Sequence, residues 1–197
     1  MVFSNLQHAS RLTLTSSAGK ISIIPQESIL FSGTVRSNLD PLSEYGDHQL
    51  WQALKAVRLE QVVDELEAGL ESKVVDNGSN FSVGQKQLIC LARAILKKNR
   101  VLVLDEATAN TDPATDQVIQ ATIRKEFADC TILTIAHRLN TIMDSDRILV
   151  MDEGEAREFD RPQDLLQDGD SFFSSMVDAY GEEQSKILRR MVKFGDE

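Results

Sequence analysis

A short apolar run that ends in two acids, VLVLDEAT at residues 101–108, constrains the fold of this chain more than any other feature. Val101–Leu104 is apolar at every position, which is typical of a strand buried on both faces of a parallel sheet. Asp105 and Glu106 then stand at the carboxyl edge of that strand, where open α/β sheets bind their ligands. Because many strands end in a solvated acidic turn, this run alone leaves a purely structural explanation equally open.

The rest of the chain alternates between short apolar runs and helical patterns, as an α/β fold requires. A parallel sheet is predicted from four runs: Ile21–Ile24, Val101–Leu104, Thr131–Ile135 and Arg147–Met151. Helices with one apolar face are predicted at Asp47–Val57, Leu59–Leu66, Val83–Lys98 and Pro113–Phe127. We therefore expect a helical subdomain at about 37–95 and, at 181–197, a helical C-terminal tail.

The composition and net charge of the chain limit the classes of molecule that it can bind. The chain has 197 residues, 42% of them hydrophobic, which suits one domain of ordinary size with a proper core. Its formal net charge of −10 argues against nucleic-acid binding, because phosphate-backbone contacts need clustered Lys and Arg. A nucleotide remains possible, since backbone amides and one or two cations can hold its phosphates. No apolar stretch approaches the roughly 20 residues that span a bilayer.

A second motif, FSVGQ at Phe81–Gln85, opens the helix that leads into the acidic strand. Ser82 as the N-cap and Gln85 three residues later fit a capping box, so the motif is explained in part by helix initiation. The same geometry forms an anion site, because free amides and the helix dipole favour negative charge there. At Gly84 the missing side chain would let a phosphate approach closely.

Together these motifs resemble the signature motif and Walker B strand of ABC transporter nucleotide-binding domains. FSVGQ, a helix containing LARA, and then DEAT form a highly specific combination, although neither half is specific alone. The resemblance covers about Lys20–Ala179. It implies a P-loop NTPase-like α/β fold with a helical subdomain, ATP and Mg²⁺ as cofactors, and ATP hydrolysis coupled to transport.

The resemblance also implies roles for single residues. Asp105 resembles the Walker B carboxylate that holds Mg²⁺, and Glu106 resembles the residue that polarises the attacking water. Gln26, which follows the run ISIIP, resembles the Q-loop glutamine that touches Mg²⁺ and senses the membrane domain. His137 resembles the switch histidine that contacts the γ-phosphate. We therefore expect these four side chains to converge at one end of the sheet.

A further set of residues is expected to contact nucleotide on another cassette. The family places its signature motif, here Ser82, Val83, Gly84 and Gln85, against the ATP of a second nucleotide-binding domain in head-to-tail arrangement. Asp112 resembles the D-loop aspartate, although an N-cap before Pro113 explains it equally well. Ser82 is therefore expected on the surface and well away from Glu106 of its own chain.

The subfamily can be narrowed by two further features. LFSGTVRSNLDP, at Leu30–Pro41, resembles the segment after the Q-loop in subfamily C, the multidrug-resistance-associated exporters. Val83 and an intact Glu106 resemble the second of that subfamily's two cassettes. The implied partners are transmembrane domains that export organic anions or conjugates, which would place the chain on the cytoplasmic face of a membrane.

One family motif is missing, because the chain contains no G-x-x-x-x-G-K-[S/T] phosphate loop. We expect a domain truncated before the Q-loop, with residues 1–19 an atypical leader that does not resemble a secretory signal. As an isolated fragment it is expected to be inactive. A non-catalytic module that lends its signature motif to a partner cassette is the alternative. A soluble ABC ATPase of the DNA-repair or translation type would predict long heptad stretches or basic patches, and the sequence has neither.

Overall fold

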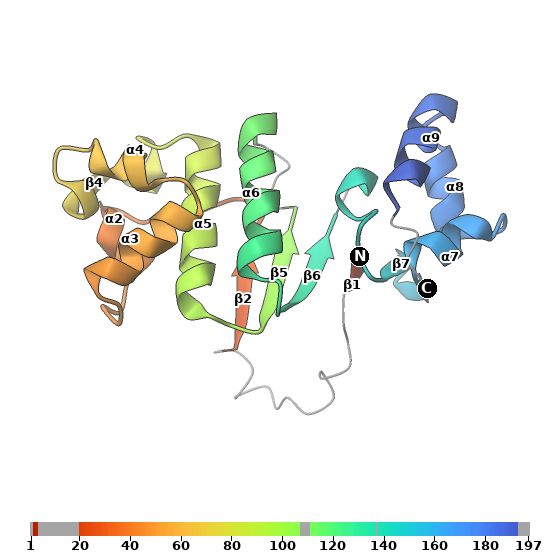
Figure 1. Cartoon of the computed structure of the whole chain (residues 1–197), viewed down its shortest axis with the longest axis horizontal. Coiled ribbons are helices and arrows are strands. Elements are labelled where there is room, and N and C mark those ends of the chain that lie inside the picture. The colour runs from red at the N-terminus through yellow and green to blue at the C-terminus, as the bar shows by residue number, and fades with distance from the viewer. Residues whose placement is uncertain (1, 4–19, 107–110, 137, 193–197) are drawn as a thin grey trace. The chain divides into compact units, whose positions relative to one another are not determined.

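The computed structural model describes residues 2–3, 20–106, 111–136 and 138–192 (Figure 1). The chain forms two compact units, one of residues 14–130 and one of residues 1–13 together with 131–197. The domain boundaries expected at residues 19, 37, 95 and 180 remain predictions.

The unit of residues 14–130 contains a pair of parallel strands. β2 (Ile21–Ile24) lies beside β5 (Val101–Asp105), and their register sets Ile21 opposite Val101 and Ile24 opposite Leu104. Ile24 and Leu104 are buried, whereas Ile23 is 66% exposed, so β2 is covered on one face and not on both. The predicted parallel pairing of these two runs is confirmed.

Helices make up most of the remainder of this unit. They are α2 (Val35–Leu39), α3 (Asp47–Ala56), α4 (Glu60–Asp64), α5 (Val83–Lys97) and α6 (Pro113–Glu126). Between α2 and α5 lie the 3₁₀ turns η2 (Gly69–Glu71) and η3 (Asp76–Gly78), and the short strands β3 (Gly33–Thr34) and β4 (Lys73–Val74) pair antiparallel. In Figure 1, α2, α3 and α4 gather on one side of α5, which also contacts β2.

α5 is buried on several sides, since the consecutive residues 88–92 are all buried. Ile89, Leu91 and Ala92 are completely buried, and burying a side chain of the size of Leu or Ile contributes about 1.5–3 kcal/mol. The helix ends at Lys98, which adopts a left-handed conformation (φ 48°) that stops the helical hydrogen bonding.

The second unit contains two antiparallel strand pairs. β6 (Thr131–Ile135) pairs with β1 (Val2–Phe3), and β7 (Ile148–Asp152) pairs with β8 (Glu155–Asp160). Residues 2–3, in the segment expected to be an atypical leader, form the short strand β1, and the extent of that leader stays a prediction. The run at Arg147–Met151 was expected in a parallel sheet, yet the strand there lies in a sheet with β8 alone.

A tight turn between β7 and β8 is the reason that this run is antiparallel. Glu153 and Gly154 both have positive φ, 49° and 81°, which is the signature of the turns whose twist suits antiparallel hairpins. The chain therefore folds straight back, and β8 takes the hydrogen-bonding edge beside β7. The residues Asp152, Glu153 and Gly154, which follow the apolar run, are the sequence feature that indicates this turn.

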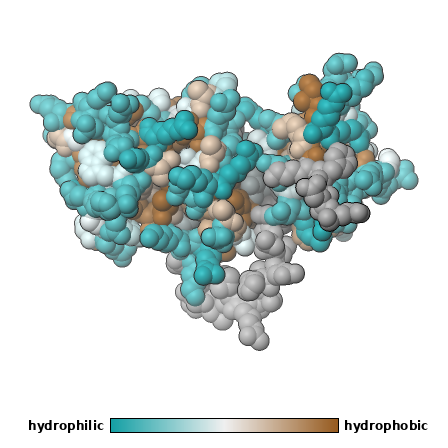
Figure 2. Space-filling view, in the orientation of Figure 1, coloured by the Kyte–Doolittle hydropathy of each residue, from teal (hydrophilic) through white to brown (hydrophobic). Residues whose placement is uncertain are grey.

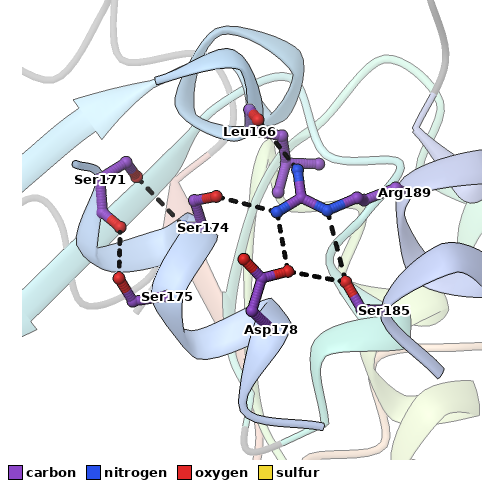
Figure 3. A network of polar contacts seen from close by, with 7 residues as sticks. All are labelled: Leu166, Ser171, Ser174, Ser175, Asp178, Ser185 and Arg189. Atoms are coloured by element: carbon purple, nitrogen blue, oxygen red, sulfur yellow. Dashed lines mark hydrogen bonds and ion pairs between the residues drawn. The ribbon is translucent and has the colours of Figure 1, made fainter. Parts of the chain in front are cut away.

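The 3₁₀ turn η4 (Leu139–Thr141) precedes β7, and the unit ends in α7 (Pro162–Gln167), α8 (Phe172–Asp178) and α9 (Glu182–Met191). A polar network joins the last three helices (Figure 3). The guanidinium of Arg189 donates to the Asp178 carboxylate and the Ser174 hydroxyl at 2.9 Å each, and to the Leu166 carbonyl at 2.9 Å. Ser185 also donates to Asp178, at 2.8 Å.

The face of the molecule drawn in Figure 2 is mostly hydrophilic, with hydrophobic side chains visible between polar ones. Within the part of the chain that the structure describes, no helix combines the length and the apolar character needed to cross a membrane.

Candidate functional site

The strongest candidate for a site lies where β2 and β5 end. Because Ile24 is opposite Leu104 in parallel register, the chain reaches Gln26 and Glu106 at the same distance beyond that pair. Their side chains meet: Gln26 Nε2 donates to Glu106 Oε2 at 3.1 Å. The convergence expected of Gln26 and Glu106 is therefore present. Both residues are accessible enough to contact a ligand, since Gln26 is exposed and Glu106 only partly buried.

The backbone at Glu106 is unusual. Its φ of 44° lies in the left-handed region, which costs a non-glycine residue of order 1 kcal/mol or more. Such strain collects at functional sites, where the surrounding structure holds a side chain in a fixed direction. Asp105, the last residue of β5, keeps extended geometry and is half-buried. The two neighbouring acids therefore leave the strand in different backbone conformations.

The donor atoms at this edge suit a hard cation. Carboxylate and amide oxygens are ligands that Mg²⁺ prefers, and Asp105 and Gln26 supply one of each from adjacent strand ends. The Gln26 nitrogen is directed to Glu106, so its carbonyl oxygen is the atom available to a cation. Among the described residues, no group of three or more His, Cys, Asp and Glu side chains is arranged around a metal position. Mg²⁺ bound by one or two protein ligands and by substrate phosphates is consistent with this.

The signature motif forms the capping box that its sequence predicted. The Ser82 hydroxyl accepts from the Gln85 amide at 3.1 Å, and the Gln85 side chain accepts from the Ser82 amide at 2.9 Å. Ser82 and Val83 are exposed, Val83 to 55%, as expected of residues that meet another molecule. An apolar side chain this exposed at the start of a helix is not explained by the capping box.

Gly84 departs from expectation. It is buried, and a Cβ built there would lie 2.8 Å from Cγ2 and 2.9 Å from Oγ1 of Thr115, in α6. Glycine is therefore required at position 84 because α5 and α6 approach closely. Thr115 thus fills the Cβ side of Gly84, and the approach of a phosphate to the Gly84 backbone stays a prediction.

Asp112 caps α6. Its Oδ1 accepts from the backbone amides of Ala114 at 3.1 Å and Thr115 at 3.0 Å, and its Oδ2 accepts from the Thr115 hydroxyl at 2.6 Å. These bonds, the one from the Thr115 hydroxyl first, lower the pKa of Asp112 below its ordinary 3.8. The N-cap explanation for Asp112 is thus sufficient, and its contact with nucleotide stays a prediction.

His137 was predicted to belong to the site, whereas Gln87 was not. His137 lies outside the described residues. Gln87 was not predicted, yet it is only 3% exposed and donates from Nε2 to the Pro25 carbonyl at 3.2 Å, directly before Gln26. A polar residue on the apolar face of the predicted helix was the signal in the sequence.

Comparison with known proteins places this arrangement in a family. The family model described as ABC transporter matches residues 3–109, more than half of the 197 residues. The match begins inside segment 1–19, so family similarity reaches further toward the N-terminus than Lys20.

Two curated relatives show the subfamily. The chain is 54% identical over 174 residues to ATP-binding cassette sub-family C member 4 of Mus musculus, covering 88% of this chain and 13% of that protein. It is 60% identical over 163 residues to a multidrug resistance-associated protein of Drosophila melanogaster, covering 82% of this chain and 12% of that protein. The chain thus spans a small part of the length of these relatives.

A solved structure of a bacterial Atm1-family ABC exporter with ATP bound is also similar. The TM-score is 0.78 at 32% identity, over 88% of this chain and 30% of that chain. This likeness confirms the expected α/β fold.

Proposed function

The chain belongs to the ABC transporter family, and on this premise we propose that it is part of a cassette whose ATP binding and hydrolysis drive export through transmembrane domains. The observation that carries the proposal is the hydrogen bond between Gln26 and Glu106 at the ends of two parallel strands. Those strand ends are where open α/β sheets bind ligands.

Within this cassette, Asp105 and the Gln26 carbonyl would hold Mg²⁺, which when bound neutralises charge on the β- and γ-phosphates. Glu106 would orient and deprotonate the attacking water, because its carboxylate is fixed by the Gln26 amide and by its strained backbone. His137 is assigned to the γ-phosphate by family resemblance alone.

The signature face would serve a second cassette in head-to-tail arrangement. The exposure of Ser82 and Val83 at the N-terminus of α5 supports this role, because free amides and the helix dipole favour a phosphate there. Gly84, Gln85 and Asp112 would contribute from the same region. The similarity to subfamily C proteins supports export of organic anions or conjugates, with this chain on the cytoplasmic face of the membrane.

The test uses inside-out membrane vesicles that contain the transporter of which this chain is part. We expect Mg²⁺- and ATP-dependent uptake of an anionic conjugate, and its loss in the Glu106→Gln variant. Glu67→Gln, an exposed acid-to-amide change in the helical region, is the matched control and should transport normally. Uptake by Glu106→Gln equal to that of the control would overturn the proposal.

The alternative function is a non-catalytic module that lends its signature motif to a partner cassette. The exposed Ser82 and Val83 at the start of α5 are the observation that favours it. The two functions differ in one result. If Ser82→Arg stops hydrolysis by the partner while Glu106→Gln changes nothing, the module is the correct function.

A further inference from the structure

Two side chains of α5 hold the two ends of the segment that contains Gln26. Gln87 donates to the Pro25 carbonyl at 3.2 Å, and Arg93 donates from Nη1 to the Ile29 carbonyl at 3.1 Å. Gln26 lies between these anchors and makes its own bond to Glu106. The helix that begins at the signature motif therefore brackets the residue that contacts the candidate base.

Arg93 reinforces its end of the bracket through α2. Its Nη2 donates to Asn38 Oδ1 at 2.8 Å, and its Nε donates to the Asn38 carbonyl. Asn38 in turn accepts from the Phe31 amide at 2.9 Å and donates to the Phe31 carbonyl at 2.8 Å. This end is thus held by several bonds, whereas the Pro25 end is held by the Gln87 amide.

The burial of Gln87 needs an explanation of its own. It is 3% exposed, on the face of α5 that carries the buried Leu91 and Ala94, where an apolar side chain would cost nothing in desolvation. A buried amide stabilises the fold only if it is hydrogen bonded, and even then the net gain is small. What distinguishes Gln87 from an apolar residue is the carbonyl that it holds, which belongs to the residue before Gln26.

We propose that Gln87 is a positioning residue that couples α5 to the Gln26–Glu106 pair, and this inference rests on the proposed function. Ser82 caps the N-terminus of α5, and Gln87 lies about 7.5 Å further along the axis of this helix. When the Ser82 end meets the nucleotide of a second cassette, any shift of α5 is passed through Gln87 to Pro25. Gln26 then moves relative to Glu106, so the partner's nucleotide adjusts hydrolysis at this chain's own site.

The test compares two variants that each remove one buried bond from a side chain to a backbone carbonyl. Gln87→Met keeps the volume of the side chain and removes the bond to Pro25. Thr122→Val is the matched control, because the 5% exposed Thr122 donates to the Ala56 carbonyl at 3.2 Å, away from Gln26. In the assembled transporter, Gln87→Met should lower the kcat for ATP about 2- to 10-fold with little change in KM. Thr122→Val should leave kcat unchanged.

A double-mutant cycle distinguishes the positioning of Gln26 by Gln87 from a purely structural role of Gln87. If Gln87 acts through Gln26, Gln87→Met should have no further effect on kcat in a Gln26→Ala background. If Gln87→Met folds poorly, Gln87→Asn keeps an amide but shortens it by one methylene, and should give the same loss. Additive losses, or equal losses in Gln87→Met and Thr122→Val, would overturn the inference.

A structural readout keeps this inference distinct from the proposed function. The side-chain amide signal of Gln26 in the NMR spectrum should shift in Gln87→Met and stay in place in Thr122→Val. An unshifted signal would overturn the positioning role whatever the chain's activity. Normal turnover by Glu106→Gln would instead overturn the proposed function.

Discussion

The side-chain amide of Gln26 donates to the carboxylate of Glu106 across 3.1 Å, although 80 positions separate the two residues. The parallel register of β2 and β5 produces this proximity, since both strands end at the same edge of the sheet. The pair thus joins the segment after β2 to the acidic turn after β5. An amide that holds a carboxylate in place fixes the direction in which that carboxylate can accept a proton.

Replacing Gln26 with Ala is predicted to lower ATP turnover about tenfold without abolishing it, because a bond to a charged group is lost while the carboxylate remains. Steady-state phosphate release by the assembled transporter measures this. Gln61→Ala, at an exposed glutamine of α4, should turn over normally. A Gln26→Ala rate equal to that of Gln61→Ala would mean that the observed bond has no part in hydrolysis.

Gly84→Ala is predicted to destabilise the fold by about 1–3 kcal/mol, because the new methyl group would lie 2.8 Å from Thr115. Adding Thr115→Ala should recover part of the loss, since it removes the two atoms nearest to the methyl group. Urea unfolding gives these free energies. Gly169→Ala is the control, because a Cβ there meets nothing within 4 Å. Equal stability of the two glycine variants would contradict the close approach of α5 and α6.

The sequence predicted the parts of the molecule that depend on local periodicity and on capping. The parallel strands at Ile21–Ile24 and Val101–Leu104, and the capping box at Ser82, follow directly from residue pattern. The packing of Gly84 on Thr115 could not be predicted, because it depends on how two helices cross. A glycine in a phosphate-binding pattern and a glycine under a neighbouring helix look identical in sequence.

The antiparallel pairing of β7 with β8 could not be predicted from the pattern of the strand. An apolar strand at Ile148–Asp152 suits a parallel sheet and an antiparallel pair alike. The two positive φ angles at Glu153 and Gly154 decide between them. The backbone conformation of the turn, and not the apolar pattern of the strand, therefore determines that the pair is antiparallel. The contact of Gln87 with Pro25 was also beyond prediction, because it depends on how α5 packs against the segment that follows β2.

Lowering the pH is predicted to destabilise the fold of the C-terminal helices, because Asp178 becomes protonated. Hydrogen bonds from Arg189, and then from Ser185, lower the pKa of Asp178 below its ordinary 3.8 (Figure 3). The ionised group thus stabilises the fold fully above its unfolded pKa of about 4, and this stability is lost as pH falls through the lower folded pKa.

Asp178→Asn keeps an acceptor but does not titrate, so its stability should fall less steeply than that of the wild type as pH drops below about 4. Thermal unfolding of both proteins across this range, followed by circular dichroism, provides the comparison. Parallel curves for the two proteins would show that Asp178 has the same pKa in the folded and unfolded states.

The 197-residue chain alone is predicted neither to bind ATP tightly nor to hydrolyse it. Phosphoryl transfer depends on positioning and charge stabilisation, and the phosphate loop supplies much of both. Its motif, G-x-x-x-x-G-K-[S/T], does not occur in these residues. Nucleotide titration should therefore show weak binding, whereas a chain joined to a segment with that loop should bind. Equal Mg²⁺-dependent turnover by both would reveal a phosphate cradle within these residues.

The most direct measurement of the central claim is single-turnover hydrolysis of γ-labelled ATP by the assembled transporter carrying Glu106→Gln. If Glu106 is the general base, the rate of the chemical step should fall about 10²–10⁴-fold while ATP stays bound, because the amide cannot accept a proton from water. Bound nucleotide and released phosphate are counted in the same sample, with Glu67→Gln as the control. Unhydrolysed ATP retained by Glu106→Gln is the predicted result, and phosphate release at the control rate would contradict the account.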